Sequence, residues 1–462
     1  MRRAAWAASL VVVVLAVGGY SSSAFAAFPG ANGKIAYAGG SIRHAVWSVN
    51  PDGTGATQLT QEGTDSSSYL PAWSKVGTRI AFASTRAISA GSRWEVEGMN
   101  ADGSARAPIT RLAQANLALL DKPSWSPDGT KLAIAAHPVN REFGICVRDF
   151  IWDYFDRQSC DVSIYTVNAD GTGLTALRPG FYPAWSPQGD RIAFSAYRGA
   201  TTEIYTMRPD GSDVTALTNN EVRDEEPAWS PDGSRLAFTS DRVQQLPNFN
   251  CCSVGPGDIY SMAADGTDVR TLVTDGALDA GPAWSPDGTK IAFASTRRTP
   301  NCEPFATFPC QSDIYEMNSD GSGPRVVAFF GHAPDWQPLN RPPDCSRASA
   351  SPATLSAPNR KLADVSLFVP DPDSDPVAVS VTGATQDEPT GGAPDAAAGT
   401  APNQVRLRAE RDSHGDGRVY RVSFDVSDGR GGTCSGTVTV GVPKGAGAAV
   451  DSAPPSYDSF AP

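Results

Sequence analysis

The most regular feature of the sequence is a pair of short alternating apolar runs around a turn, which recurs along residues 28–340. Its clearest copy is PAWSPDGTKIAFASTR, starting at Pro282. Alternation on both sides of Ser-Pro-Asp-Gly predicts a β-hairpin, because Pro presets φ at the second turn position and Gly accepts a positive φ. A second predicted hairpin follows each copy, for example DIYEMNSDGSG from Asp313. Four strands per repeat are typical of a β-propeller blade.

The pieces of the repeat predict a closed ring. The N-terminal repeat, from Asn32, has no Pro-x-Trp strand, whereas residues 334–338 form such a strand with no repeat after it. These two fragments complete one blade, so the sequence predicts a six-bladed β-propeller closed by a shared first and last blade. The Pro-x-Trp strands are marked by Trp73, Trp125, Trp185, Trp229, Trp284 and Trp336.

The repeated Pro-x-Trp-Ser-Pro-Asp-Gly, Ile-Ala-Phe, Ile-Tyr and Asp-Gly pattern resembles the TolB-type β-propeller family, over residues 27–340. The resemblance implies the propeller fold. For function it implies a partner-binding role in the bacterial envelope. The family's domain before the propeller has no counterpart here, because a signal-like segment leads almost directly into the first repeat.

The first 26 residues read as a secretory signal peptide. Arg2 and Arg3 precede an apolar run, and Ala24-Phe25-Ala26 has the small-x-small form of a cleavage site. We therefore expect a secreted or periplasmic protein with no membrane span after cleavage. The formal net charge is −12, which argues against a polyanion-binding surface, so nucleic acid is not an expected partner.

Eight cysteines in an exported chain predict disulfides. Cys146 with Cys160, and Cys302 with Cys310, would each close an insertion within one blade. Cys345 with Cys434 would tie the first strand of the last domain to its last strand. The adjacent Cys251 and Cys252 have no assigned partners, and the sequence alone does not fix the connectivity. Zinc is the alternative, but the thiolate spacing of zinc sites is absent.

Residues 341–443 change to alternating runs of β-sandwich size, such as Val419 to Val426. They resemble bacterial Ig-like or cadherin-like domains, so the overall prediction is an all-β propeller followed by an Ig-like β-sandwich. Residues 444–462 are rich in Ala, Gly, Ser and Pro and are expected to be disordered. Asp371, Asp373 and Asp375 alternate as calcium ligands do, although EF-hand features are missing, and an acidic turn without an ion is the alternative. Calcium is the only cofactor predicted, and none is required.

Length variation concentrates on one predicted face of the propeller, in the loops after the second strands. The longest insertion carries Phe150, Trp152, Tyr154 and Phe155. These aromatic residues predict either a packed cap or a contact patch for a partner.

The sequence shows no catalytic constellation. Gly-x-Ser-x-Gly elbows are absent, and His44, His137, His332 and His414 are each isolated. Arginines that end the second strands, including Arg242 and Arg297, are expected to pair across the sheet with Asp258 and Asp313.

We therefore predict a monomeric, non-enzymatic protein-interaction scaffold with a protein partner. A protein that binds carbohydrate or peptidoglycan is the first alternative, with an envelope glycan as ligand. A glycan lyase or hydrolase is the second alternative.

Overall fold

The protein is all-β in the part of the chain that the structure describes. Apart from two 3-10 helices, Leu112–Ala115 and Cys345–Arg347, its regular elements there are β-strands. None of the described segments is a helix long and apolar enough to cross a membrane. The computed structural model describes residues 30–40, 44–61, 67–88, 91–139, 162–199, 201–242, 257–298, 312–356, 360–373, 375–389, 394–410, 417–444, 449 and 457–461.

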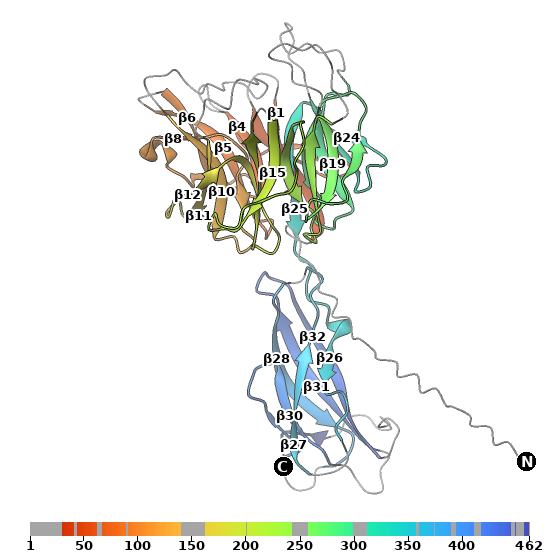
Figure 1. Ribbon diagram of the computed structural model, residues 1–462. Helices are drawn as coiled ribbons and strands as arrows, with labels where there is room; N and C mark the ends of the chain where they lie inside the picture. The colour runs from red at the N-terminus through yellow and green to blue at the C-terminus, as the bar shows by residue number, and fades with distance from the viewer. Residues whose placement is uncertain are drawn as a thin grey trace, which may run out of the picture.

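The described strands before residue 340 form antiparallel sheets of four or five strands, an arrangement consistent with a β-propeller (Figure 1). The first sheet contains β25 (Gly331–Leu339), β1 (Ala31–Gly39), β2 (Ala45–Val49) and β3 (Thr57–Gln58). The second contains β4 (Ser68–Trp73), β5 (Arg79–Ile88), β6 (Gly91–Asn100) and β7 (Ala107–Pro108). The third contains β8 (Leu117–Leu119), β9 (Ser124–Trp125), β10 (Lys131–Pro138), β11 (Ser163–Asn168) and β12 (Thr175–Pro179).

Three further sheets repeat the four-stranded order along the chain. The fourth contains β13 (Phe181–Trp185), β14 (Ile192–Arg198), β15 (Thr201–Met207) and β16 (Thr215–Ala216). The fifth contains β17 (Asp224–Trp229), β18 (Arg235–Ser240), β19 (Asp258–Ala263) and β20 (Arg270–Val273). The sixth contains β21 (Asp279–Trp284), β22 (Lys290–Ser295), β23 (Asp313–Asn318) and β24 (Arg325–Ala328).

The Ser-Pro-Asp-Gly turns hold the first two strands of a sheet together by local bonds. In the turn of the sixth sheet, Gly288 has φ +72° and donates its N–H to Ser285 O at 2.9 Å. The Ser285 hydroxyl donates to Asp287 Oδ1 at 2.7 Å and accepts the Lys290 N–H at 2.9 Å. The short polar side chains of the turn therefore form hydrogen bonds with turn groups that have no partner in the pairing between the strands.

Neighbouring sheets share apolar cores, and the last sheet shares one with the first. Residues of the sixth and first sheets meet in one buried cluster, which includes Ala283, Ile314, Ile35 and Trp336. In the first sheet, β25 also pairs directly with β1, with Ile35 opposite Trp336. The two ends of the repeat region are therefore joined both by backbone pairing and by packing.

Beyond residue 340 the chain forms two further sheets around one core, whose largest buried side chains are Tyr420 and Phe424. One sheet contains β26 (Ser349–Ser351), β27 (Leu362–Phe368), β30 (Gln404–Arg408) and β29 (Ala396–Ala398). The other contains β32 (Thr433–Pro443), β31 (Gly417–Ser427), β28 (Ala378–Gln386) and β33 (Tyr457–Asp458). Cys345 and Cys434 form a disulfide, as predicted.

The predicted disordered tail differs from the structure at its end. Tyr457 and Asp458 form β33 and pair with Gln386 and Thr385 of β28. The Ser459 N–H also bonds Ala384 O at 3.0 Å. Backbone N–H and C=O groups, which every residue but Pro carries, make these bonds, so the composition of the segment gave no signal for them.

The C-terminal sheets lie beside the face of the propeller-like body at which β25 ends (Figure 1). They touch the turn between β4 and β5, where Ser74-Lys75-Val76-Gly77 replaces the usual Ser-Pro-Asp-Gly. Arg430 Nη2 donates to Lys75 O at 2.7 Å, and Lys75 Nζ lies 3.4 Å from Asp375 Oδ1. The departure from the repeat thus occurs at the turn that contacts the C-terminal sheets.

Candidate functional site

The first strands of the sheets surround a channel of about 180 Å³. The first sheet contributes its lining from β25 and the third from β9 and the residues before it. The residue before each Pro-x-Trp proline lines the channel, and these residues differ widely in chemistry. They are Leu70, Lys122, Tyr182, Glu226, Gly281 and Ala333.

Most of these pre-proline residues have a left-handed backbone, with φ of 55° at Leu70, 52° at Tyr182, 57° at Glu226, 63° at Gly281 and 50° at Ala333. Each lies at a register shift between the first and second strands of its sheet. A left-handed conformation costs a residue other than Gly roughly 1–2 kcal/mol. Strain of this kind persists where the surrounding structure enforces it, and it concentrates at functional positions.

The channel walls include tryptophan side chains, some of whose indole N–H groups donate a hydrogen bond to a described residue and some of which do not. Trp125 Nε1 donates to Ala72 O at 3.2 Å, and Trp229 Nε1 donates to Ala184 O at 3.1 Å. Four other channel indoles have a buried Nε1 with no hydrogen-bond acceptor in the described part of the chain. These are Trp73, Trp185, Trp284 and Trp336.

The charged side chains of the described channel lining are all bonded within the protein. Lys122 Nζ lies 2.7 Å from Asp335 Oδ1, and Asp335 Oδ2 accepts the Trp73 N–H at 2.7 Å. Glu226 Oε2 accepts the Thr239 hydroxyl at 2.8 Å and the Gly281 N–H at 2.7 Å. These contacts link different sheets around the channel, and they engage the lining carboxylates in structural bonds.

The arginines that end the second strands pair differently from the prediction. Arg242 Nη2 bonds Asp224 Oδ2 at 2.7 Å, and Arg297 Nη2 lies 3.2 Å from Asp279 Oδ2. The predicted partner Asp258 is therefore wrong for Arg242. Asp224 and Asp279 begin the first strands of their sheets. Arg242 and Arg297 stack on Phe and Tyr rings of the second and third strands, and from there their guanidinium groups reach these two carboxylates.

The prediction for Arg297 is also wrong, because the neighbouring Arg298 is the residue that pairs with Asp313, at 2.6 Å. The sequence signal that we missed is a co-occurrence. In the fifth and sixth sheets, the second strand is followed by Arg242 or Arg297, and an Asp stands five residues before the Pro-x-Trp tryptophan. The other repeats with an Arg at the equivalent position have no Asp there.

Asp258 is a fully buried carboxylate, and neither of its oxygens has a hydrogen-bond partner among the described residues. Its counterparts Glu95, Glu203 and Asp313 each accept the backbone N–H of the residue seventeen positions later, namely Leu112, Asn220 and Phe330. Burial, with a further contribution from Asp279, Asp275 and Asp241, raises the pKa of Asp258 to about 6. Burial likewise raises the pKa of Asp279 to about 6.

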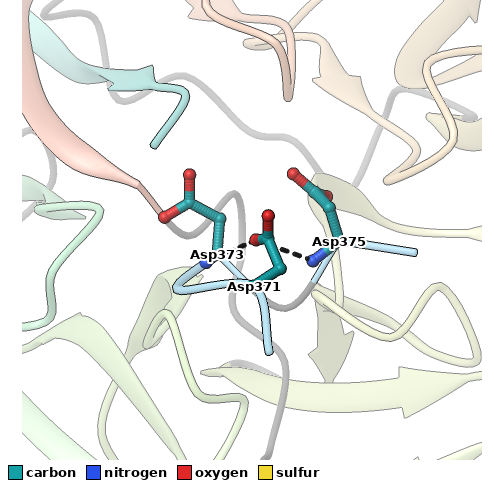
Figure 2. A group of neighbouring side chains, drawn as sticks. All are labelled: Asp371, Asp373 and Asp375. Carbon is teal, nitrogen blue, oxygen red and sulfur yellow. Dashed lines mark hydrogen bonds between the residues drawn. The ribbon is translucent and has the colours of Figure 1, made fainter. Parts of the chain in front are cut away.

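The predicted calcium ligands Asp371, Asp373 and Asp375 do come together, with ligand oxygens within 4.8 Å of one another (Figure 2). Asp371 Oδ1 accepts the N–H groups of Asp373 at 2.7 Å and Asp375 at 3.2 Å. Burial raises the pKa of Asp371, whose buried Oδ2 has no hydrogen-bond partner among the residues that the structure describes.

Cationic side chains already occupy two of these three carboxylates. Arg341 Nε lies 2.6 Å from Asp373 Oδ1, and Asp375 pairs with both Lys75 and Arg430. A calcium ion would have to displace these cations, so the donor set is suitable in chemistry but is engaged at the junction with the C-terminal sheets.

Two histidines that the sequence analysis treated as isolated lie in contact. The ring centroids of His44 and His332 are 4.9 Å apart, although the two residues are 288 positions apart in the chain. Burial lowers the pKa of His44 to about 4. Burial, with a smaller contribution from His44, lowers the pKa of His332 to about 3. Both imidazoles are therefore neutral at neutral pH.

Several predicted features lie outside the described residues. These are the signal peptide, the aromatic residues Phe150, Trp152, Tyr154 and Phe155, and the cysteines Cys146, Cys160, Cys251, Cys252, Cys302 and Cys310.

The sequence of the propeller region matches a known family model. Residues 76–250 match the model described as the TolB beta propeller domain, PD40. These residues are therefore similar to the TolB-like PD40 propeller family. The TolB-like region also aligns with the uncharacterized protein Atu1656 of Agrobacterium fabrum, at 26% identity over 255 residues, which are 48% of this chain and 82% of that protein.

Two proteins whose names include TolB are also similar to this chain. The Protein TolB homolog of Chlorobium luteolum is 29% identical over 138 residues, which cover 29% of this chain and 29% of that protein. The chain therefore spans less than a third of the length of that relative. The crystal structure of TolB from Acinetobacter baumannii superposes with a TM-score of 0.47 and 17% identity, over 66% of this chain and 67% of its own.

Proposed function

We propose that this protein is a secreted or periplasmic, non-enzymatic scaffold whose TolB-like propeller binds a protein partner at the channel. The observation that carries the proposal is the set of pre-proline residues around the channel. Their strained backbone is nearly constant, whereas Leu70, Lys122, Tyr182 and Glu226 present different side chains. A rigid frame that displays variable side chains is typical of a binding surface.

The proposed architecture is a closed ring of six blades followed by an Ig-like β-sandwich. Pairing of β1 with β25 and the core shared by the first and sixth sheets support the ring. The two C-terminal sheets around one core, joined by the Cys345–Cys434 disulfide, support the sandwich.

The position of the C-terminal sheets favours the opposite face of the propeller for the partner. Lys75 and Gly77, in the turn after β4, contact Arg430 and Gln337 of the same chain. The face that carries this turn is therefore partly used within the molecule. The strand ends before the long insertions, Ser240 and Ser295 among them, lie at the other end of their sheets from such turns. We place the partner there, over the channel mouth.

The bonded state of the charged channel residues favours binding over catalysis. Lys122 pairs with Asp335, and Glu226 is bonded to Thr239 and Gly281. General acid–base catalysis needs a titratable group that is within reach of substrate and can exchange a proton. The indole and proline walls also suit a sugar ring, so an envelope glycan is the alternative ligand and turnover of that glycan is the second alternative.

Site-specific photocrosslinking of the mature full-length chain tests the proposal. A photoreactive residue replaces Tyr182 in the channel, and the control replaces the exposed Thr172 in an Asp-Gly turn. We expect one envelope or secreted protein to crosslink repeatedly at position 182 and not at 172. The same protein, once purified, should bind Tyr182→Ala less tightly than it binds the native chain. Equal labelling at both positions, or retention of glycan and no protein, would overturn the proposal.

A further inference from the structure

The strand register places His44 and His332 on one face of the first sheet. His332 in β25 is the direct partner of Ala38 in β1, and Gly39 is the partner of Ala45 in β2. Side chains alternate along a strand, so His44 lies on the opposite side from Ala45, which is the side of Ala38 and His332. Ala38 and Gly40 are the residues of the intervening chain segment that lie nearest to the two histidines on that side. These small residues leave space in which the imidazoles meet.

The Tyr69 ring of the second sheet packs against both histidines. The Tyr69 ring lies 4.6 Å from the His44 ring and 5.9 Å from the His332 ring, measured between centroids. Trp94 packs against Tyr69 at 5.0 Å. The planes of the two imidazoles are inclined by 71° to each other. Each histidine ring is thus in contact with the other and with Tyr69.

Each imidazole of the pair has a buried nitrogen that finds no hydrogen-bond partner in the described part of the chain. These atoms are His44 Nδ1 and His332 Nε2. A buried polar atom that lacks a partner costs about 1–3 kcal/mol. By contrast, Nδ1 of the buried His137 lies 3.1 Å from Pro138 O. Two unsatisfied nitrogens on neighbouring neutral imidazoles form a donor set that hydrogen bonding within the described protein does not use.

We propose that His44 and His332 bind a divalent first-row transition ion, with zinc, copper or nickel as the chemical class. Zinc–imidazole bonds of about 2.0–2.1 Å on a tetrahedral ion place the two ring centroids about 5 Å apart. The observed separation of 4.9 Å meets this requirement. Neutral imidazole selects these ions, whereas calcium and magnesium prefer oxygen ligands.

The site leaves coordination positions open. Among the described residues, the only group of three acidic, His or Cys side chains close enough to hold a metal is Asp371, Asp373 and Asp375, on the C-terminal sheets. Water or a donor from a bound molecule would complete the coordination of the histidine-bound ion. This inference does not depend on the proposed function, because it rests on the two rings alone.

Metal titration of the mature chain tests the proposal. The protein carries no histidine tag and has its free thiols alkylated, and Zn²⁺, Cu²⁺ and Ni²⁺ are titrated by calorimetry, with Ca²⁺ as a comparison. We expect binding of one transition ion per chain. His44→Ala and His332→Ala should each weaken it by about 10-fold or more, since loss of even an indirect support of a ligand costs that much. His137→Ala is the matched control and should leave the affinity unchanged.

A second measurement keeps the test decisive if an alanine variant unfolds. The ¹⁵N shifts of the imidazole nitrogens are followed in the native chain during zinc addition, and those of His44 and His332 should move together before those of His137. The proposal is overturned if the native chain binds no transition ion, if binding survives both His44→Gln and His332→Gln, or if only other histidines respond.

Discussion

Lys75 Nζ lies 3.4 Å from Asp375 Oδ1 and joins a turn of the propeller to the C-terminal sheets. Arg430 also pairs with Asp375 and donates to Lys75 O. Asp375 is fully buried at its side chain, so its charge depends on these two cations. The orientation of the two parts of the molecule is thereby coupled to one small ionic cluster.

We predict that Arg430→Ala loosens this junction. Removal of one partner of a buried pair typically costs about 3–5 kcal/mol, because the remaining charge is left uncompensated. Small-angle X-ray scattering should show a wider range of interdomain distances, and the C-terminal sheets should melt earlier. Arg406→Ala is the control, since Arg406 and Asp364 form an exposed pair at 3.6 Å and such pairs contribute under about 1 kcal/mol. Identical behaviour of the two variants would contradict the prediction.

Calcium affinity should rise when the competing cation is removed. If the spacing of Asp371, Asp373 and Asp375 reflects a calcium site, Ca²⁺ must compete with Arg430 for Asp375. We therefore expect calorimetry to give tighter Ca²⁺ binding for Arg430→Ala than for the native chain. Asp371→Asn in the same background should abolish it. Absence of Ca²⁺ binding in the Arg430→Ala variant would exclude the calcium site.

The buried carboxylate of Asp258 should make stability fall as the pH rises. Its pKa is about 6 in the folded protein and near the ordinary 3.8 in the unfolded chain. Between these values the folded state binds more protons, so the free energy of unfolding decreases from pH 4 to pH 6. Asp258→Asn should remove part of this slope and should stabilise the protein at pH 7 by roughly 1–3 kcal/mol, since one pKa unit corresponds to about 1.4 kcal/mol.

Urea unfolding at pH 4, 5, 6 and 7 measures the effect of Asp258→Asn. The matched control is Asp313→Asn, since Asp313 occupies the equivalent strand position but is bonded to Arg298 and to the Phe330 N–H. This variant should be destabilised at pH 7. A pH dependence that is unchanged in Asp258→Asn would contradict the assignment.

The left-handed backbone before the channel prolines can be tested at Gly281. A Cβ added there meets no atom within 4 Å, so only its φ of +63° opposes a side chain. We expect Gly281→Ala to lower the free energy of unfolding by about 1 kcal/mol, as backbone strain outweighs the lower entropy of the unfolded chain. Gly383→Ala is the control, because that Cβ is equally free and the backbone there is not left-handed. It should be neutral or stabilising in the same thermal or denaturant unfolding experiment.

The sequence predicted features that local pattern determines. The alternation around Ser285–Gly288 predicted β21, β22 and their turn, and the fragments at Asn32 and Trp336 predicted the pairing of β1 with β25. The Cys345–Cys434 pair followed from the positions of the two cysteines at the ends of the last domain.

Features that depend on register between distant strands could not be predicted. His44 and His332 meet because β25 and β2 flank β1 in one particular alignment, and a shift by one residue would turn one ring to the other face. The left-handed conformation at Tyr182 was also missed. The general preference before Pro is for extended backbone, and the bulge in β13 overrides it.

The pairing of β1 with β25 also governs how the molecule can be assembled. Strand β1 is synthesised first, yet its partner on one side, β25, emerges about 300 residues later. Until then β1 presents unsatisfied N–H and C=O groups, which can pair with another chain. The native contacts of this sheet have a high sequence separation, so they form late and slowly. The yield of folded protein should therefore increase when nascent chains are kept apart or when folding is delayed until β25 is available. A protein whose first strand pairs only with the next strand would benefit less.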